Sequence, residues 1–194
     1  DKKINVASVD INKLREEMGM VFQNFNLFSN MSIIENLTLA PVMRGKMTKK
    51  EANEKAIKLL KRIGLSQKKN VYPVSLSGGQ KQRVSIAGVV AMMSDYIIFD
   101  EPTDMLDPKG RKDVIKLVEE LNKNYGKTII YITHYMEEAI IADKIVVLDK
   151  GKVALEGSAR EVFSKVDQMK DLGLAVPQVT EVAYELSKKG VKFQ

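Results

Sequence analysis

Two stretches of the chain, Tyr96–Phe99 and Thr128–Thr133, consist of consecutive apolar or β-branched side chains. Such continuous runs, which do not alternate with charged residues, are typical of strands in a parallel sheet that is covered on both faces. We therefore predict that the middle of the chain is α/β, with both stretches in one parallel sheet. Apolar positions also predict an edge strand in Ile4–Ile11 and a short strand in Met18–Gln23.

Three S/T-x-x-E/Q patterns predict where helices begin, because the side chains of such a capping box satisfy the first free N–H groups of a helix. These patterns are Ser32–Glu35, Thr48–Glu51 and Ser77–Gln80. Gly64 is placed to end the second helix, and we expect the third to run to about Met93.

The second half of the chain carries further helix and hairpin signals. Asp107 before Pro108 predicts a helix start, since aspartate caps an N-terminus and proline suits the first helical position. We expect this helix to reach about Asn124. The remaining expected elements are a hairpin of Lys144–Asp149 and Lys152–Glu156 and two or three short tail helices, the last from Pro177 to about Lys189.

The composition is that of an ordinary globular protein, with 44% hydrophobic and 29% charged residues in a length of 194. The net charge of +6 suits an anionic ligand or a negatively charged membrane surface, but it is too small and too evenly spread to indicate nucleic-acid binding. The lack of cysteine excludes disulfides and thiolate metal sites. The longest apolar run, Val84–Met93, is about half as long as a bilayer span. We therefore expect no direct membrane insertion.

Polar residues follow three of the predicted strands. Asp100 and Glu101 come directly after the first apolar run, and the carboxyl end of a buried parallel strand is where α/β sheets bind ligands. Asp100 could hold Mg²⁺, and Glu101 could polarise an attacking water as a general base. Gln23 could ligate Mg²⁺ or orient a water, and His134, the only histidine, could contact a γ-phosphate. Taken singly, each could equally be a polar residue at the end of a strand.

The stretch Ser77–Gln80 places two glycines inside a capping box. A helix N-terminus that exposes glycine N–H groups favours an anion, because its unpaired donors and the helix dipole both attract negative charge. A plain entry from loop to helix is the alternative. The usual cradle of a nucleotide triphosphate, G-x-x-x-x-G-K-[ST], does not occur in the sequence.

The order and spacing of these residues resemble the ATP-binding-cassette (ABC) ATPases from Met18 onward. The resemblance implies a P-loop NTPase-like core, with a mostly parallel sheet and flanking helices, plus a helical subdomain. The positions that carry it are Gln23 (Q-loop), Leu76–Gln80 (LSGGQ signature), Asp100 and Glu101 (Walker B strand end and catalytic glutamate), Leu106-Asp107 (D-loop) and His134 (switch histidine).

In that family, two nucleotide-binding domains enclose two ATP molecules head to tail, and the signature of one subunit faces the ATP of the other. The resemblance implies that Ser77 and Gly79 touch the γ-phosphate of the partner's ATP, with Gly78 and Gln80 completing the signature. It implies that Asp107 communicates across the dimer. The partner is a second ABC ATPase subunit, in a homodimer or a heterodimer.

The same resemblance assigns roles toward ATP and Mg²⁺ on the other side of the subunit. Asp100 and Gln23 would serve Mg²⁺, and Gln23 would also couple the metal and the water to the transporter. Glu101 would activate the attacking water, and His134 would contact the γ-phosphate. The Walker A loop should lie upstream of Gln23, and the 22 residues before it contain none. We therefore expect an N-terminally truncated sequence that is inactive in hydrolysis by itself. The alternative is a remnant that only donates LSGGQ to a partner's ATP site.

The two halves of the chain resemble different importers. Gly19–Tyr72 is similar to the ATPases of polar amino-acid importers, and the part from Ala87 onward to those of energy-coupling-factor vitamin and metal importers. The chain is expected to bind a membrane permease through Asn24–Tyr72, peripherally on the cytoplasmic face. The membrane subunits set the solute, so neither half predicts it. A ribosome- or DNA-associated relative would carry two cassettes or long coiled-coil insertions, and neither occurs here.

The resemblance also divides the chain into four expected segments. They are a remnant of the N-terminal β subdomain with the Q-loop strand (1–23), a helical subdomain (24–76), the α/β core with the signature helix (77–157) and a C-terminal helical extension (158–194).

Overall fold

The computed structural model describes residues 17–22 and 24–191. The chain divides into two compact units, residues 1–132 and 133–194. The strand expected at Ile4–Ile11 lies outside the described residues, as does Gln23. The four segments expected from the sequence stay a prediction.

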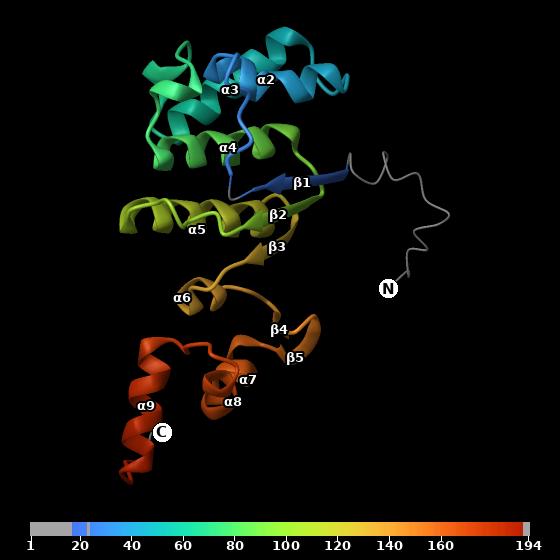
Figure 1. The fold of residues 1–194 in the computed structure, drawn as a ribbon. Helices are drawn as coiled ribbons and strands as arrows, with labels where there is room; N and C mark the ends of the chain where they lie inside the picture. The colour runs from blue at the N-terminus through green and yellow to red at the C-terminus, as the bar shows by residue number, and fades with distance from the viewer. Residues whose placement is uncertain (1–16, 23, 192–194) are drawn as a thin grey trace, which may run out of the picture. The chain divides into compact units, whose positions relative to one another are not determined.

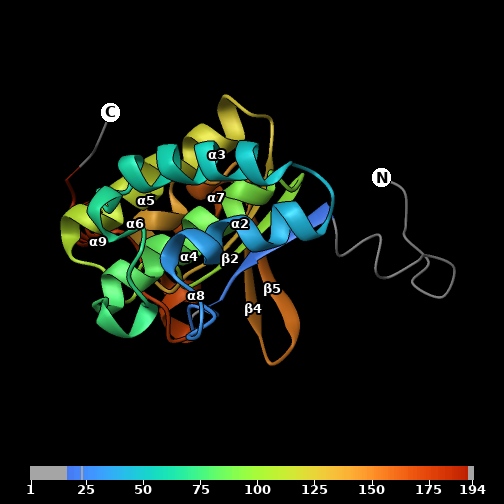
Figure 2. The ribbon, with the colours of Figure 1, turned by 90° about the horizontal axis from the view of Figure 1, so that it is seen from above.

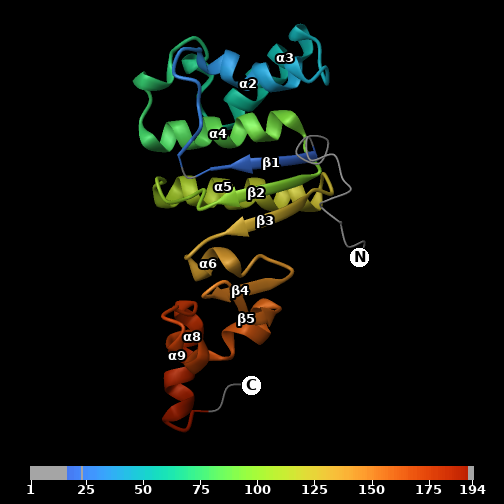
Figure 3. The same cartoon turned by 45° about the vertical axis from the view of Figure 1, so that its right-hand side comes forward.

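The first unit is built on a parallel sheet with the strand order β1-β2-β3. The strands are Met18–Val21, Tyr96–Asp100 and Thr128–Ile132. Val21 pairs with Phe99, which pairs with Tyr131 on its other side. The three strands lie side by side in Figure 3. The prediction that the two apolar runs share a parallel sheet is confirmed.

Two helices pack on one face of this sheet. They are α4 (Gly78–Met92) and α5 (Pro108–Lys123), and they end close to the predicted positions. Ile97 and Phe99 of β2 point to this face and are almost fully buried. Ile86 of α4 and Val118 of α5 join them in one core cluster.

The other face of the sheet carries apolar side chains that are exposed. Tyr96, Ile130 and Ile132 keep 44%, 49% and 46% of their surface accessible. The prediction of a sheet covered on both faces is therefore wrong for the described residues. Continuous apolar runs indicate that both faces avoid water, but they do not indicate which segment covers each face.

A helical layer lies beyond α4 (Figure 1). Its helices are α2 (Ile33–Met43) and α3 (Lys49–Arg62), followed by two short 3-10 helices at Ser66–Lys68 and Pro73–Ser75. Both α-helices begin with the predicted capping boxes. Val84 and Ala87 of α4 pack into the core of this layer, so α4 joins two hydrophobic cores on opposite sides.

The second unit contains a hairpin and short helices around Val162, Phe163 and Met169. Figure 2 shows the hairpin as a two-stranded ribbon. The predicted antiparallel hairpin and the expected short tail helices are confirmed. The elements are α6 (Met136–Ala139), β4 (Ile145–Asp149), β5 (Lys152–Gly157), α7 (Ala159–Phe163), α8 (Val166–Asp171) and α9 (Gln178–Lys188).

Candidate functional site

The N-terminus of α4 has the geometry that the sequence predicts. Ser77 is the N-cap, and its Oγ accepts a hydrogen bond from the backbone N–H of Gln80 at 3.3 Å. The side-chain oxygen of Gln80 accepts one from the N–H of Ser77 at 3.0 Å. Ser77 and Gly78 are exposed. The first N–H groups of this 15-residue helix therefore face solvent with the positive end of its dipole.

Gly79 lies against the loop that leads into α5. A Cβ added to Gly79 would stand 3.1 Å from the carbonyl oxygen of Met105 and 3.4 Å from a methyl carbon of Leu106. Backbone thus approaches backbone at this point, and a glycine permits it. The contact joins the signature stretch to the segment that follows the two carboxylates.

The two carboxylates lie at the carboxyl edge of the sheet. Asp100 is the last residue of β2, and Glu101 has a left-handed backbone with φ of 44°. The N–H of Glu101 donates to the carbonyl of Ile132 at 3.0 Å, which ties the turn to the end of β3. A non-glycine residue in this conformation costs about 1–3 kcal/mol, a strain that clusters at functional sites. Both carboxylates are half-buried, and together they offer the oxygen ligands that Mg²⁺ prefers.

Asp107 caps α5. Its Oδ1 accepts a hydrogen bond from the N–H of Gly110 at 2.8 Å, and Pro108 is the first helical residue. The predicted cap is therefore confirmed. Its predicted role across a dimer stays a prediction.

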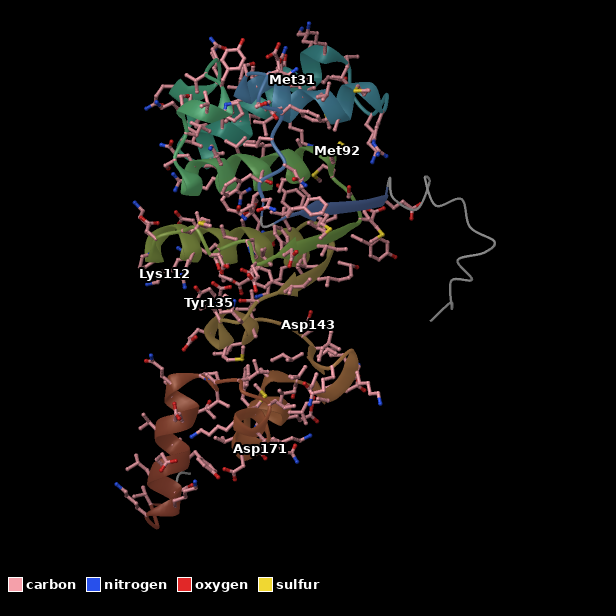
Figure 4. All side chains as sticks on the ribbon, viewed as in Figure 1. Met31, Met92, Lys112, Tyr135, Asp143 and Asp171 are labelled. Atoms are coloured by element: carbon pink, nitrogen blue, oxygen red, sulfur yellow. The ribbon has the colours of Figure 1, made fainter. Side chains whose placement is uncertain are left out.

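His134 belongs to the second unit, two residues after β3 ends. Its ring lies 4.2 Å from the ring of Tyr135, centroid to centroid, and Figure 4 labels Tyr135. The N–H of Tyr135 donates to Thr133 Oγ1 at 3.0 Å, and that hydroxyl donates to Glu138 at 3.0 Å. Gln23 lies outside the described residues, so its predicted roles stay predictions.

A hollow of about 260 Å³ opens between β1, Phe22, residues 25–28, α2 and α4. Apolar side chains dominate its lining, among them Phe25, Leu37 and Met92, which Figure 4 labels at the end of α4. Arg44 is the one charged residue among the described residues that line it. The expected permease-binding region, Asn24–Tyr72, contains Phe25 and Arg44, but no local pattern in the sequence marks which loop and helix residues converge on the hollow.

The described residues include no helix that is both long enough and apolar enough to cross a membrane.

Comparisons with known proteins agree with this geometry. The family model described as ABC transporter matches residues 2–104. The chain is 51% identical over 182 residues to the energy-coupling factor transporter ATP-binding protein EcfA1 of Clostridium novyi, covering 93% of this chain and 65% of the relative. It is 44% identical over 163 residues to the glutamine transport ATP-binding protein GlnQ of Geobacillus stearothermophilus, covering 84% of this chain and 67% of the relative.

A solved dimeric ATP-binding cassette in a post-hydrolysis state, bound to ADP and phosphate, has a similar fold. The two chains share 34% identity with a TM-score of 0.73, over 80% of this chain and 70% of that chain. Across five EcfA1 relatives from clostridia and related bacteria, this chain spans 64–65% of their length.

Proposed function

Because the chain belongs to the ABC transporter family of ATP-binding proteins, we propose that it is the ATP-binding subunit of an importer and takes part in ATP hydrolysis within a dimer. The predicted family and fold class are confirmed by the family match and the solved cassette. The relatives are named for energy-coupling factor transport and for glutamine transport. An importer is the type of transporter that the sequence resemblance implies. The observation that carries the proposal is the exposed glycine N-terminus of α4, which lies against the loop that follows the two carboxylates.

The signature stretch supplies half of a composite ATP site. The free N–H groups of Gly78 and Gly79 and the hydroxyl of Ser77 are donors at the positive end of α4, and they suit the terminal phosphate of an ATP. In the family to which the chain belongs, the signature of one subunit faces the ATP of the other. The ATP that Ser77–Gly79 contacts is therefore one held by a second ATPase subunit.

Asp100 and Glu101, which form the acidic turn after β2, would supply the metal ligand and the general base for hydrolysis. Bound Mg²⁺ would neutralise charge on the phosphates, and Asp100 offers it a carboxylate. Glu101 follows Asp100 directly and has a left-handed backbone. Its carboxylate would accept the proton of the attacking water. Gln23 would complete the metal ligands, and His134 would contact the γ-phosphate.

The hollow beside α2 and α4 is the docking site for the permease. Its apolar lining suits an apolar segment, and Arg44 is the only charged residue among the described lining residues. The fitting partner is therefore an apolar permease segment on the cytoplasmic side. Docking here would hold the subunit peripherally on the cytoplasmic face of the membrane.

Hydrolysis in a mixed complex tests the proposal. The chain is mixed with an ABC ATPase subunit that carries G-x-x-x-x-G-K-[ST], and phosphate release is measured. We expect the chain to accelerate hydrolysis and Ser77→Ala to lower this gain about tenfold or more, because one phosphate donor is lost. Ser75→Ala, two residues earlier, is the matched control and should keep the gain within about twofold. A gain that is insensitive to Ser77, or no complex at all, would overturn the proposal.

The donor-only function is the second candidate, and the exposed N-terminus of α4, whose donors need no nucleotide bound by their own chain, favours it. In this case the chain offers LSGGQ and hydrolyses nothing at its own acidic turn. The same mixture separates the two, with Glu101→Gln in this chain. A rate that is unchanged by Glu101→Gln but lowered by Ser77→Ala supports donation alone.

A further inference from the structure

The positive charge of the chain is concentrated in one segment of the helical layer. Residues 44–69 hold ten of the 31 Lys and Arg residues and two of the 25 Asp and Glu residues. This segment therefore carries +8, and the remaining residues together carry −2, against a total of +6. The expectation that the charge is evenly spread is wrong for this segment. A local excess of this size attracts anionic surfaces that the total charge alone would attract weakly.

The helix α3, which makes up most of this segment, is held in place along one side. Ala52, Ala56 and Leu60 are at most 3% exposed, and the last two belong to the core of the helical layer. Near the end of the helix, Arg62 forms an ion pair with Glu120 of α5. Residues four apart share one face of a helix, so the opposite face of α3 is turned to solvent in a fixed orientation.

The solvent face of α3 presents three lysines. Lys50, Lys58 and Lys61 are exposed, and none of them forms an ion pair with another residue of the part that the structure describes. The helix has two acidic residues, Glu51 and Glu54, and Glu51 is engaged in the capping box. The positive charge on this face is therefore largely uncompensated.

An apolar side chain lies among these lysines. Ile57 keeps 47% of its surface accessible, whereas the other apolar residues of α3 are buried or half-buried. It precedes Lys58 directly and lies one turn from Lys61 and two turns from Lys50. Lysines around an apolar side chain suit the boundary of a bilayer, where the ammonium groups meet phosphates and the apolar groups leave water. A soluble polyanion would offer Ile57 no apolar contact.

We propose that this basic face of α3, formed by Lys50, Ile57, Lys58 and Lys61, binds the headgroups of an anionic lipid bilayer. The ammonium groups pair with lipid phosphates, and Ile57 enters the boundary between headgroups and acyl chains. Each lysine that reaches such a surface is worth about fivefold in affinity, so three together are worth about 100-fold. The contact goes beyond the proposed docking to a permease and needs neither the permease nor ATP.

The test measures binding of the full 194-residue chain to lipid vesicles by co-sedimentation, without nucleotide or permease. Vesicles with equal parts of phosphatidylglycerol and phosphatidylcholine are compared with vesicles of phosphatidylcholine alone. We expect binding to the anionic vesicles that weakens as salt is added, because ions screen charges at a surface, and little binding to the neutral vesicles. Equal binding to both kinds of vesicle, or binding to neither, would overturn the inference.

Replacing Lys50, Lys58 and Lys61 together by glutamine should weaken binding to the anionic vesicles about 30-fold or more. Glutamine is nearly as good a helix former as lysine, so the substitutions should leave the fold intact, which circular dichroism checks.

The matched control removes the same charge from another helix. Lys109, Lys112 and Lys116 are exposed lysines of α5, and Figure 4 labels Lys112. Replacing all three by glutamine lowers the net charge by the same amount, and it should weaken vesicle binding by less than about threefold if the basic face of α3 makes the contact. An equal loss in both triple variants would assign the binding to total charge and overturn the inference.

Ile57→Ser separates a bilayer from a soluble polyanion. We expect it to weaken vesicle binding about threefold or more, because an apolar side chain no longer enters the boundary, and Ile57→Leu to keep the binding. Binding to polyglutamate, which offers charge alone, should be the same in all three forms. Vesicle binding that Ile57→Ser leaves unchanged would overturn the choice of a bilayer. No hydrolysis or partner ATPase is involved, so failure here is distinguishable from failure of the Ser77 experiment.

Discussion

Gly79 and Met105 approach each other so closely that a Cβ at position 79 would stand 3.1 Å from the carbonyl oxygen of Met105. The contact joins the helix that carries the signature stretch to the loop that follows the two carboxylates. A glycine here has a steric reason, and this reason is separate from any contact with a phosphate. The steric explanation predicts that substitutions at Gly79 and at Gly78 differ in their effect on stability, and the phosphate explanation predicts no such difference.

Gly79→Ala should destabilise the fold relative to Gly78→Ala. A Cβ at Gly78 meets its nearest neighbours at an ordinary 3.9 Å, whereas one at Gly79 must displace backbone. Alanine is the better helix former in both places, so Gly78→Ala should be neutral or slightly stabilising. We expect the two variants to differ by about 1 kcal/mol in the free energy of unfolding from urea titrations. Equal stabilities of the two variants would show that the loop at Met105 moves away from the added Cβ at no cost in free energy.

Helix starts could be predicted from the sequence because they depend on short-range hydrogen bonds. The patterns beginning at Ser32, Thr48 and Ser77 each form a reciprocal capping box. Asp107 caps its helix through Gly110, as predicted. The strands could be predicted from the apolar runs. The exposure of Ile130 could not be predicted, since an apolar run does not indicate which segment covers it.

The order of the site residues could be predicted, but their mutual contacts could not. Chain order placed Ser77–Gln80 before Asp100 and Glu101, and the stretch that the family model matches, residues 2–104, contains both. The contact of Gly79 with Met105, and the ring of Phe25 near Gly78, depend on how loops fold back on α4. No periodicity or spacing in a sequence encodes a contact of this kind, because it arises between segments that are far apart in the chain.

Gln82→Met should stabilise the protein. Gln82 is 1% exposed, and neither of its amide atoms has a hydrogen-bond partner among the described residues. A buried amide without partners costs its desolvation, and methionine fills a similar volume without that cost. We expect a gain of about 1 kcal/mol, or about 2–4 °C in Tm, measured by thermal unfolding.

Gln67→Met is the control for Gln82→Met, because Gln67 is exposed and its substitution should change stability by less than about 0.5 kcal/mol. A loss of stability in Gln82→Met alone would mean that the amide is paired in solution.

Asp95→Asn should lower stability at neutral pH but not in strong acid. The Lys127 ammonium donates a hydrogen bond to the Asp95 carboxylate at 2.8 Å and, with its charge, lowers the pKa of that carboxyl below 3.8. A carboxyl whose pKa is lowered in the folded state stabilises it above the unfolded value and loses this effect as pH falls through the folded value. Urea titrations should therefore show a difference between wild type and Asp95→Asn at pH 5–7 that shrinks below about pH 4.

The Lys127→Met background is the control for Asp95→Asn, since it removes the partner of the carboxylate. In that background, Asp95→Asn should have little effect at any pH. A difference that persists there would assign the effect of Asp95 to another contact.

Glu101→Gln should stall ATP turnover while leaving ATP binding intact. The substitution is made in a fusion that places the Walker A segment of a family member ahead of this chain, so that the acidic turn has a nucleotide to act on. Glutamine keeps the shape of the side chain but cannot accept the proton of the attacking water, and removal of a general base lowers kcat about 100-fold or more. Asp100, which would serve Mg²⁺, remains, so the Kd for ATP should change by less than about threefold. Phosphate release and nucleotide titration measure the two quantities.

Glu119→Gln in the same fusion is the matched control. Glu119 is a carboxylate of α5 that pairs with Lys123 at 3.0 Å on the same helix, away from the turn. An exposed pair of this kind contributes little, so the control should keep kcat within about twofold. If Glu101→Gln also kept kcat while the fusion bound and hydrolysed ATP, then the proton acceptor would have to be another group, and the strained turn at Glu101 would be left with a purely structural role.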